Sequence, residues 1–257
     1  MTDTKTIFIT GAASGIGRAT AKLFAERGWF VGLYDLDEKG LAALRIETGT
    51  SKTCMGVLDV ASLDDFKRNV DDFARTTGGR MDVLFNCAGI LRMGRFEHIP
   101  PEQAHQQIQV NLVGVVNGVY ASLPLLEKTE GATILNMSSA SAIYGTPELA
   151  VYSATKFAVR ALTEALDLEL RRKDIRVADI MPSYVATPMV HNQKYRAKSL
   201  ETVGVNLKAE HIAEVAWRAV NGKKGVHHLL RPELKLFVRL AGFESLARQT
   251  MRYLSKM

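Results

Sequence analysis

Tyr152 and Lys156 are the residues whose types and spacing best suit proton transfer, and both lie in a stretch of helical period from Val151 to Arg172. Residues four apart share one face of a helix, so the phenol and the ammonium group are expected to be neighbours. An unperturbed tyrosine has a pKa of about 10, which leaves roughly one phenol in a thousand ionised at neutral pH. A nearby positive charge favours the phenolate, so the pair predicts a general acid/base.

A tyrosine and a lysine four residues apart often occur by chance. Whether this spacing indicates a catalytic pair therefore depends on the surrounding residues. Ser139 lies upstream of Tyr152, at the end of a continuous apolar run over Ala132 to Met137. In a parallel α/β sheet the ligand groups gather where strands end. The hydroxyl of Ser139 is therefore expected among the ligand groups of the site.

A glycine-rich loop follows the first apolar run directly, with the sequence Thr10-Gly11-Ala12-Ala13-Ser14-Gly15-Ile16-Gly17. Glycines let the chain turn sharply and let backbone N–H groups at a helix N-terminus approach a pyrophosphate. The spacing departs from the usual G-x-G-x-x-G, and a structural turn is the alternative. The loop predicts a dinucleotide site that involves Gly11, Ser14, Gly15, Ile16 and Gly17.

Asp35 and Leu36 come directly after the second apolar run, Trp29 to Tyr34. A carboxylate at this place accepts hydrogen bonds from the adenosine ribose and repels a 2′-phosphate. Asp35 therefore favours NAD over NADP. The alternative is that Asp35 only starts a turn before the next helix.

Seven short apolar runs alternate with stretches of helical period. The runs are continuous, as expected for parallel strands covered on both faces. The predicted strands are Thr6–Thr10, Trp29–Tyr34, Thr53–Val57, Val83–Asn86, Ala132–Met137, Ile175–Met181 and Gly225–Leu230. A first helix is predicted between the glycine loop and Gly28, and further helices over Leu63–Ala74, Pro101–Leu126, Val151–Arg172 and Ala209–Asn221. The order predicts an α/β fold, a single-domain, Rossmann-like, doubly wound parallel sheet with helices on both faces, over residues 1–257.

Composition excludes several classes of protein. The chain has 257 residues, 47% hydrophobic and 23% charged, which is typical of globular proteins. The lack of a long apolar run and the polar N-terminus predict a cytoplasmic protein. Two cysteines, Cys54 and Cys87, indicate a reducing compartment, and the six scattered histidines predict no metal site. No nucleic-acid recognition motif is present, so nucleic acid is not an expected partner.

Two segments interrupt the alternation. Residues 183–208 are polar and too long for an ordinary connection, so they are predicted to form a substrate lid loop. Residues 231–257 form a basic amphipathic tail with six basic and two acidic residues, and Gly242 is predicted to divide it into two short helices. The tail is expected to close over the substrate cleft or pack on a partner subunit, and peripheral contact with an anionic membrane is the alternative.

Together these motifs resemble the short-chain dehydrogenase/reductase family in its form of about 250 residues. The family's order is met over residues 5–230 by the TGxxxGxG loop, Asp59-Val60, Asn86-Cys87-Ala88-Gly89, Asn111, Ser139 and Tyr152-x-x-x-Lys156. The resemblance implies a cofactor site that adds Asp59, Val60, Asn86, Ala88, Gly89, Tyr152, Lys156, Pro182, Val185 and Thr187. Two residues depart from the family pattern, Cys87 in place of an asparagine and Ser183 in place of a glycine.

The resemblance also implies roles in catalysis. Hydride passes between the substrate carbon and nicotinamide C4 while Tyr152 transfers the proton. Ser139 would hold the substrate oxygen, and Asn111 would hold a water that links Lys156 to solvent. The structural alternatives are a helix cap for Ser139, a kink residue for Asn111 and a solvated helix face for Lys156.

We therefore predict an NAD(H)-dependent alcohol dehydrogenase or carbonyl reductase. A non-catalytic dinucleotide-sensing protein on the same fold is the alternative, and an epimerase or dehydratase would need a larger C-terminal domain. A mostly apolar set of lining residues favours a hydrophobic substrate: Met93, Ile143, Tyr144, Met181 and Met189. A homodimer or homotetramer is expected through the helices predicted at Pro101–Leu126 and Val151–Arg172.

Overall fold

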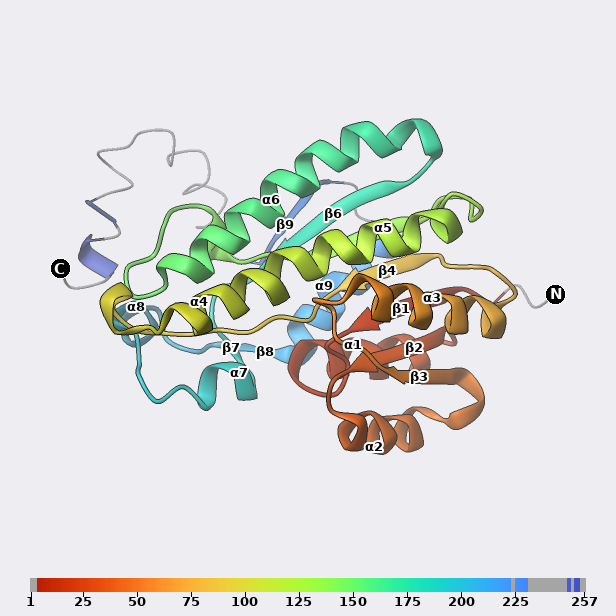
Figure 1. Cartoon of the computed structure of the whole chain (residues 1–257), viewed down its shortest axis with the longest axis horizontal. Helices are drawn as coiled ribbons and strands as arrows, with labels where there is room; N and C mark the ends of the chain where they lie inside the picture. The colour runs from red at the N-terminus through yellow and green to blue at the C-terminus, as the bar shows by residue number, and fades with distance from the viewer. Residues whose placement is uncertain (1–3, 223–224, 231–248, 251, 255–257) are drawn as a thin grey trace.

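The computed structural model describes residues 4–222, 225–230, 249–250 and 252–254. A parallel sheet with the strand order β3-β2-β1-β4-β5-β6-β9 forms its centre (Figure 1). Its strands are β1 (Thr6–Thr10), β2 (Phe30–Asp35), β3 (Thr53–Val57), β4 (Val83–Asn86), β5 (Thr133–Met137), β6 (Arg176–Met181) and β9 (His227–Leu229). This confirms the predicted fold class, and the strand order reverses between β1 and β4.

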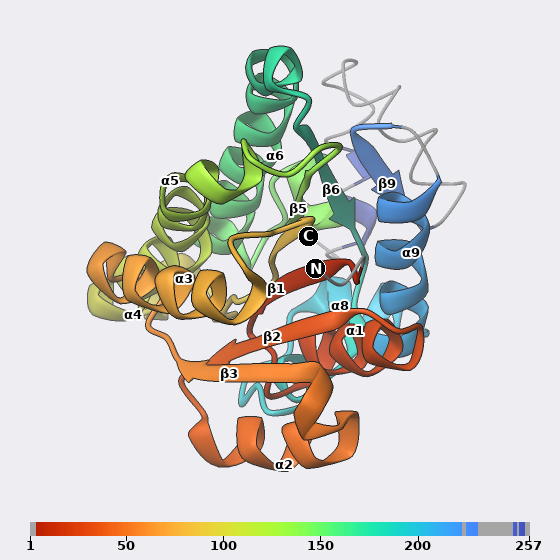
Figure 2. The same cartoon turned by 90° about the vertical axis from the view of Figure 1, so that its right-hand side faces the viewer.

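Helices cover both faces of the sheet. They are α1 (Gly15–Glu26), α2 (Glu38–Thr48), α3 (Leu63–Thr77), α4 (Pro101–Ile108), α5 (Gly114–Leu126), α6 (Ala150–Leu170), α7 (Pro188–His191), α8 (Lys198–Val203) and α9 (Ala209–Asn221). Figure 2 shows α1 and α9 on one side of the sheet and α3, α5 and α6 on the other. Each side has its own apolar core, with Phe24 and Ile212 in the first and Phe66 and Phe73 in the second.

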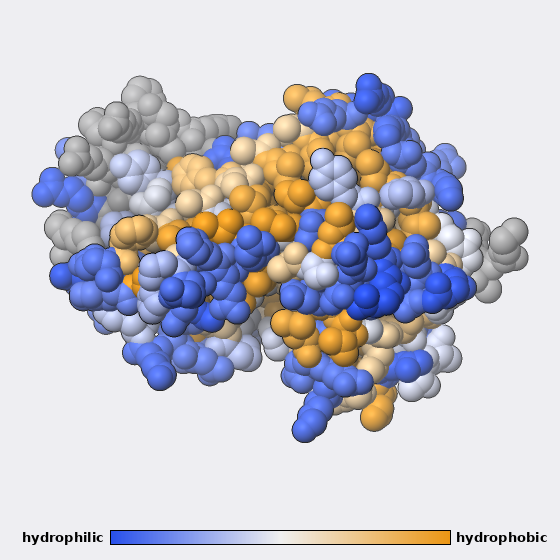
Figure 3. All heavy atoms as spheres, viewed as in Figure 1, coloured by the Kyte–Doolittle hydropathy of each residue, from blue (hydrophilic) through white to orange (hydrophobic). Residues whose placement is uncertain are grey.

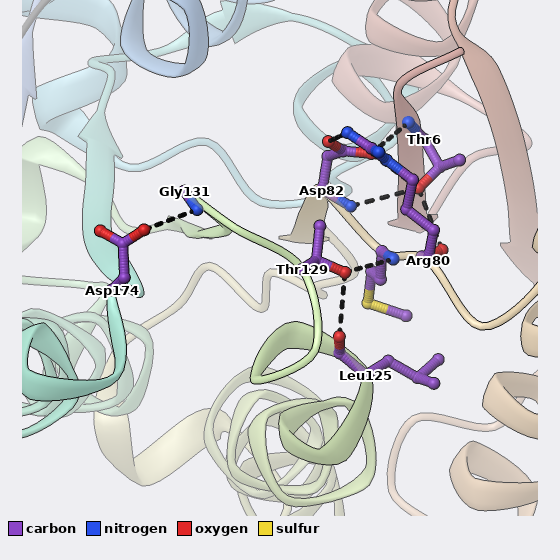
Figure 4. A network of polar contacts seen from close by, with 8 residues as sticks. Thr6, Arg80, Asp82, Leu125, Thr129, Gly131 and Asp174 are labelled. Carbon is purple, nitrogen blue, oxygen red and sulfur yellow. Dashed lines mark hydrogen bonds and ion pairs between the residues drawn. The ribbon is translucent and has the colours of Figure 1, made fainter. Parts of the chain in front are cut away.

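A buried carboxylate fixes the amino ends of β1 and β4 (Figure 4). Asp82 is only 7% exposed, and its Oδ2 accepts hydrogen bonds from the Thr6 amide at 2.8 Å and from Arg80 Nε at 2.7 Å. Thr6 Oγ1 in turn accepts from the Asp82 amide at 3.1 Å. The charge of Asp82 is thus paired and hydrogen-bonded, as a buried charge requires. The ligand site lies at the opposite, carboxyl ends of β1 and β4.

The run predicted as a single helix, Pro101–Leu126, contains a wider π-helical turn at Gln109–Val113 between α4 and α5. By length and composition this run is apolar enough to cross a membrane. In the fold it packs instead against α3, α6 and β4. Some of its apolar residues, such as Val115 and Leu126, are buried in the core, whereas Tyr120 is exposed.

The segment predicted as a lid loop has its own secondary structure. Strands β7 (Val185–Ala186) and β8 (Leu207–Lys208) pair in parallel, and α7 and α8 lie between them. Figure 1 shows these elements beyond the carboxyl ends of the main strands. Most of the predicted tail, residues 231–248, 251 and 255–257, lies outside the described residues, and so does the predicted division at Gly242.

Candidate active site

A cavity of about 680 Å³ opens at the carboxyl ends of the strands, where the strand order reverses. Ligands of open α/β sheets bind at this point of the topology. The structure brings together there most of the residues predicted from the sequence. They are Gly11, Ser14, Gly15, Ile16, Gly17, Asp35, Leu36, Asp59, Val60, Ala88, Gly89, Ser139, Tyr144, Tyr152, Lys156, Pro182, Val185, Thr187 and Met189.

The glycine loop packs too closely for side chains. A Cβ on Gly11, which has a φ of +70°, would lie 2.9 Å from the Cα of Ala88. A Cβ on Gly17 would lie 2.1 Å from the carbonyl oxygen of Gly11. The loop therefore brings the backbone at the start of α1 to the cavity wall, and this cradle fits a pyrophosphate.

Thr187 completes the cradle from the opposite side of the cavity. A Cβ on Gly15 would lie 3.2 Å from Cγ2 of Thr187, so the start of α7 faces the glycine loop closely. The Thr187 hydroxyl donates to the carbonyl oxygen of Val185 at 3.3 Å. This placement suits the phosphate-contacting role that the family resemblance implies.

Asp35 both shapes the turn after β2 and faces the cavity. Its Oδ2 accepts from the Ala13 amide at 3.0 Å and its Oδ1 from the Asp37 amide at 3.1 Å. Each carboxylate oxygen has two lone pairs, so both can accept a further hydrogen bond. Among the described residues that line the cavity, Lys156 is the one basic side chain, and Arg18 beside the loop is paired with Glu47 at 2.5 Å.

Tyr152 and Lys156 project from α6 toward the end of β5. The Nζ of Lys156 donates to the carbonyl oxygen of Met137 at 2.7 Å and lies 5.6 Å from the centroid of the Tyr152 ring. Burial raises the pKa of Tyr152 to about 12, although a hydrogen bond to Ser139 opposes the rise. Burial also lowers the pKa of Lys156 to about 8. Desolvation therefore outweighs the attraction between lysine and phenolate that the sequence argument expects.

Ser139 both caps a helical turn and lines the cavity. Its Oγ accepts from the Ser141 amide at 3.2 Å and so caps a short helical turn, and the two hydroxyl oxygens lie 3.0 Å apart. The same side chain lines the cavity with Tyr152. The cap fixes the hydroxyl in place.

Asn111 and Asn86 lie behind the cavity wall. Asn111 occupies the π-helical turn, accepts from the Ile90 amide at 2.7 Å and donates to the Ile90 carbonyl oxygen at 2.9 Å. Asn86 donates to Oδ1 of Asn136 at 3.0 Å inside the sheet. Neither side chain lines the cavity, but Asn111 is tied to the backbone of Ile90, which does line it.

Three predicted substrate residues belong to the core instead. Met93 is 7% exposed within an apolar cluster under the segment 183–208, and Ile143 (4%) and Met181 (0%) form another cluster. None of them lines the cavity, because each points to the side of its segment that packs inward. The cavity wall beside Tyr152 includes residues that the sequence argument missed: Ile90, Leu91, Leu149, Tyr184, Val190, Ser199 and Val203.

The C-terminal helical residues also reach the cavity. Thr250 and Leu254, four residues apart on one helical face, line it. Tyr253 points away and is 78% exposed. Thr250 and Leu254 thus place the described part of the tail at the cavity.

Comparison with known proteins agrees with this site. The model of the short chain dehydrogenase family matches residues 5–198. The chain is 36% identical over 217 residues to the 3-oxoacyl-acyl-carrier-protein reductase FabG of Thermotoga maritima, which covers 82% of this chain and 88% of that protein. The chain belongs to the short-chain dehydrogenase/reductase family of oxidoreductases.

Solved structures of the family bind either type of nicotinamide cofactor. A short-chain dehydrogenase/reductase from Burkholderia phymatum in complex with NAD matches with a TM-score of 0.85 and 26% identity, over 96% of this chain and 95% of that one. An alcohol dehydrogenase from Thermococcus sibiricus complexed with 5-hydroxy-NADP matches with a TM-score of 0.78 and 28% identity, over 89% and 97%. The fold is shared with both.

Proposed function

We propose that the protein is an NAD(H)-dependent oxidoreductase that interconverts a hydrophobic alcohol and its carbonyl compound. The observation that carries this proposal is the cluster of Ser139, Tyr152 and Lys156 in one cavity with the glycine loop. Bound NAD(H) accepts or supplies the hydride. The protein's own groups then have to move one proton and hold one oxygen.

Tyr152 is the proton donor in reduction and the acceptor in oxidation. Its raised pKa keeps the phenol protonated at neutral pH, which is the form that reduction of a carbonyl needs. Ser139 holds the substrate oxygen beside the phenol, and Lys156, fixed by the carbonyl of Met137, supplies positive charge one helical turn away. In oxidation the positive charge of the nicotinamide ring adds to that of Lys156 and favours the phenolate.

The lining of the cavity beside Tyr152 supports a hydrophobic substrate. The side chains there are largely apolar, with Leu91, Leu149, Met189, Val190 and Leu254 among them. Apolar side chains offer an alkyl or aromatic group a favourable transfer from water, whereas they leave the hydroxyls of a sugar without partners.

The carboxylate of Asp35 supports a preference for NAD(H). It lies at the cavity where the adenosine ribose would be held, and the described lining offers no arginine for a 2′-phosphate. A non-catalytic dinucleotide sensor on this fold remains the second candidate. The buried, hydrogen-bonded lysine beside Tyr152 argues against it, because a sensor has no use for so costly a group.

A substrate panel tests this function. The purified protein is mixed with hydrophobic alcohols, ketones and aldehydes, with sugars as the comparison class, and with NAD(H) or NADP(H), while nicotinamide absorbance is followed. We expect turnover of hydrophobic members with NAD(H). Binding of NADH without turnover across the panel would favour the sensor instead.

A further inference from the structure

Glu148, four residues before Tyr152, has a strained backbone. Its φ is +65°, and Asp174 is the other non-glycine residue with a positive φ in the described ranges. A left-handed conformation costs an ordinary residue about 1–2 kcal/mol, so it persists only where the surroundings enforce it. A glycine would avoid this cost, and the position nevertheless has a long acidic side chain.

The Glu148 side chain makes two strong hydrogen bonds to the segment 183–208. Its Oε1 accepts from the Tyr195 hydroxyl at 2.5 Å, and its Oε2 accepts from the Lys198 amide at 2.7 Å. The hydrogen bond to Glu148 raises the pKa of Tyr195. Glu148 is only 6% exposed, and its carbonyl oxygen accepts from the Gly94 amide at 2.9 Å.

The Lys198 amide is the first N–H of α8, and no side chain next to it in the sequence caps that helix. Glu148 takes over the cap from 50 residues away in the sequence. A charged acceptor at a helix N-terminus is favourable both as a hydrogen bond and with the helix dipole. The orientation of α8 is therefore tied to the segment that leads into α6.

The contact matters for the cavity because both of its sides line that cavity. Leu149 follows Glu148, while Ser199 and Val203 lie on α8, and all three line the cavity. Ser199 also shares a hydrogen bond of 2.7 Å with the hydroxyl of Tyr184. The part of the cavity wall formed by α8 is thus held at two points, by Glu148 and by Tyr184.

We propose that Glu148 is a positioning residue, whose carboxylate holds α8 as a wall of the substrate pocket and so sets substrate affinity without touching the reacting atoms. The part of this inference that concerns substrate affinity rests on the proposed function. The inference also gives the strained backbone at Glu148 a role, because the surroundings that hold the residue in this conformation include the two hydrogen bonds of its side chain.

The first test needs no substrate, because Lys194 and Arg196 are trypsin sites within the held segment. Glu148→Gly removes the carboxylate and the backbone strain together, and we expect cleavage after Lys194 and Arg196 to accelerate about tenfold. Glu148→Gln keeps an acceptor for the Lys198 amide and a group that can bond Tyr195, so we expect at most a threefold change. Mass spectrometry of the fragments over time measures both.

Asp174→Gly is the matched control. Like Glu148→Gly, this substitution removes a non-glycine residue that has a positive φ. The Asp174 side chain accepts from the Gly131 amide at 2.9 Å (Figure 4), and neither residue lines the cavity. We expect it to leave the cleavage rate at Lys194 and Arg196 unchanged. In all three variants the dissociation constant of NADH, followed by its fluorescence, should change less than about twofold, because the glycine loop is untouched.

Steady-state kinetics supply the second test, with phenanthrenequinone as the hydrophobic carbonyl probe and NADH as the reductant. For Glu148→Gly we expect KM to rise about tenfold while kcat stays within about threefold of the value for the unmodified protein. For Glu148→Gln we expect KM to stay close to that of the unmodified protein. The positioning role would be overturned if Glu148→Gly left the cleavage rate unchanged. It would also be overturned if Glu148→Gln and Glu148→Gly changed the cleavage rate and KM equally. If the unmodified protein does not reduce the quinone, the substrate proposal fails for this class, and the proteolysis and NADH measurements still decide the role of Glu148.

Discussion

Lys156 is held by the carbonyl oxygen of Met137, at 2.7 Å from its Nζ. The lysine is 3% exposed and its pKa is lowered to about 8 by burial. The carbonyl at the end of β5 thus fixes an ammonium group where the solvent cannot stabilise it. The position serves the reaction at some cost to the stability of the fold.

Lys156→Met is expected to raise the melting temperature by about 2–6 °C at pH 7 while activity is lost. A lysine whose pKa is lower in the folded than in the unfolded state destabilises the fold below its folded pKa. That penalty disappears as the pH rises from about 8 toward the unfolded value of about 10.4. Scanning calorimetry at pH 7 and pH 9.5 measures both effects. Equal melting temperatures of the two proteins at pH 7 would contradict the penalty.

Tyr152→Phe is expected to lower kcat by about 10²–10⁴-fold, because it removes the transferable proton and leaves the ring in place. The NADH dissociation constant should stay within about threefold, since the glycine loop and Asp35 are unchanged. Stopped-flow turnover and NADH fluorescence test the two statements. A variant that keeps more than half of kcat would refute the role of Tyr152.

Asp35→Ala is expected to reduce the ratio of kcat/KM for NADH over NADPH by about tenfold or more, because the carboxylate no longer repels a 2′-phosphate. Asp37→Ala is the matched control. The Asp37 side chain caps α2 through the Gly40 amide at 3.0 Å and does not line the cavity. It should cost about 1 kcal/mol of stability and leave the ratio unchanged. An unmodified protein that prefers NADPH would overturn the assignment.

The outer faces of α5 and α6 are expected to form the interface of a homo-oligomer. Tyr120 and Leu168 are each 70% exposed there, and Figure 3 shows apolar residues gathered over this side of the molecule. Replacing both by glutamate should shift the protein toward the monomer at micromolar concentration, because an apolar interface does not accept unpaired charges. Ile46→Glu, at a residue 76% exposed on α2, is the control. Light scattering gives the mass of each variant.

Leu254 is expected to contribute to substrate affinity as part of the cavity wall. Leu254→Asp should raise KM for a hydrophobic carbonyl by about 3–10-fold, since it replaces apolar contact by a charge. Tyr253→Ala is the control, because Tyr253 is 78% exposed beside it. Equal KM values for all three proteins would remove Leu254 from the substrate site.

The same region also tests the membrane alternative for the tail. Full-length protein and a chain shortened to residues 1–230 are sedimented with phosphatidylserine vesicles at low and high salt. Salt-sensitive binding that is lost on shortening would support peripheral membrane contact. Absence of binding, with a raised KM in the shortened chain, would support closure over the cleft.

Strand positions were largely predictable because continuous apolar runs mark buried parallel strands. β1, β3 and β4 begin and end as predicted. Helix α2 was not predicted, because its buried side chains are only Leu41 and Leu44. The π-helical turn inside Pro101–Leu126 was not predicted, because hydropathy does not register a change in helical hydrogen bonding.

Site residues near the strand ends were predictable because backbone geometry places them, whereas the substrate wall was not. Gly11 and Asp35 follow strands and must face the crevice. Leu149 and Val203 lie on two distant segments, which the hydrogen bond between Glu148 and Tyr195 joins. A contact between segments so far apart in sequence leaves no local sequence pattern from which it could be predicted. Met93 and Ile143 show the converse, as apolar residues near the site that tertiary packing turns inward.

The paired hydrogen bonds between Asn111 and Ile90 imitate a neighbouring strand. The carboxamide presents one donor and one acceptor to the Ile90 backbone, as an adjacent extended chain would. The backbone N–H and C=O of Ile90 therefore have their hydrogen bonds satisfied without a further β ladder. The shape of the cavity wall at Ile90 thus depends on a side chain of the π-helical turn, 21 residues further along the chain.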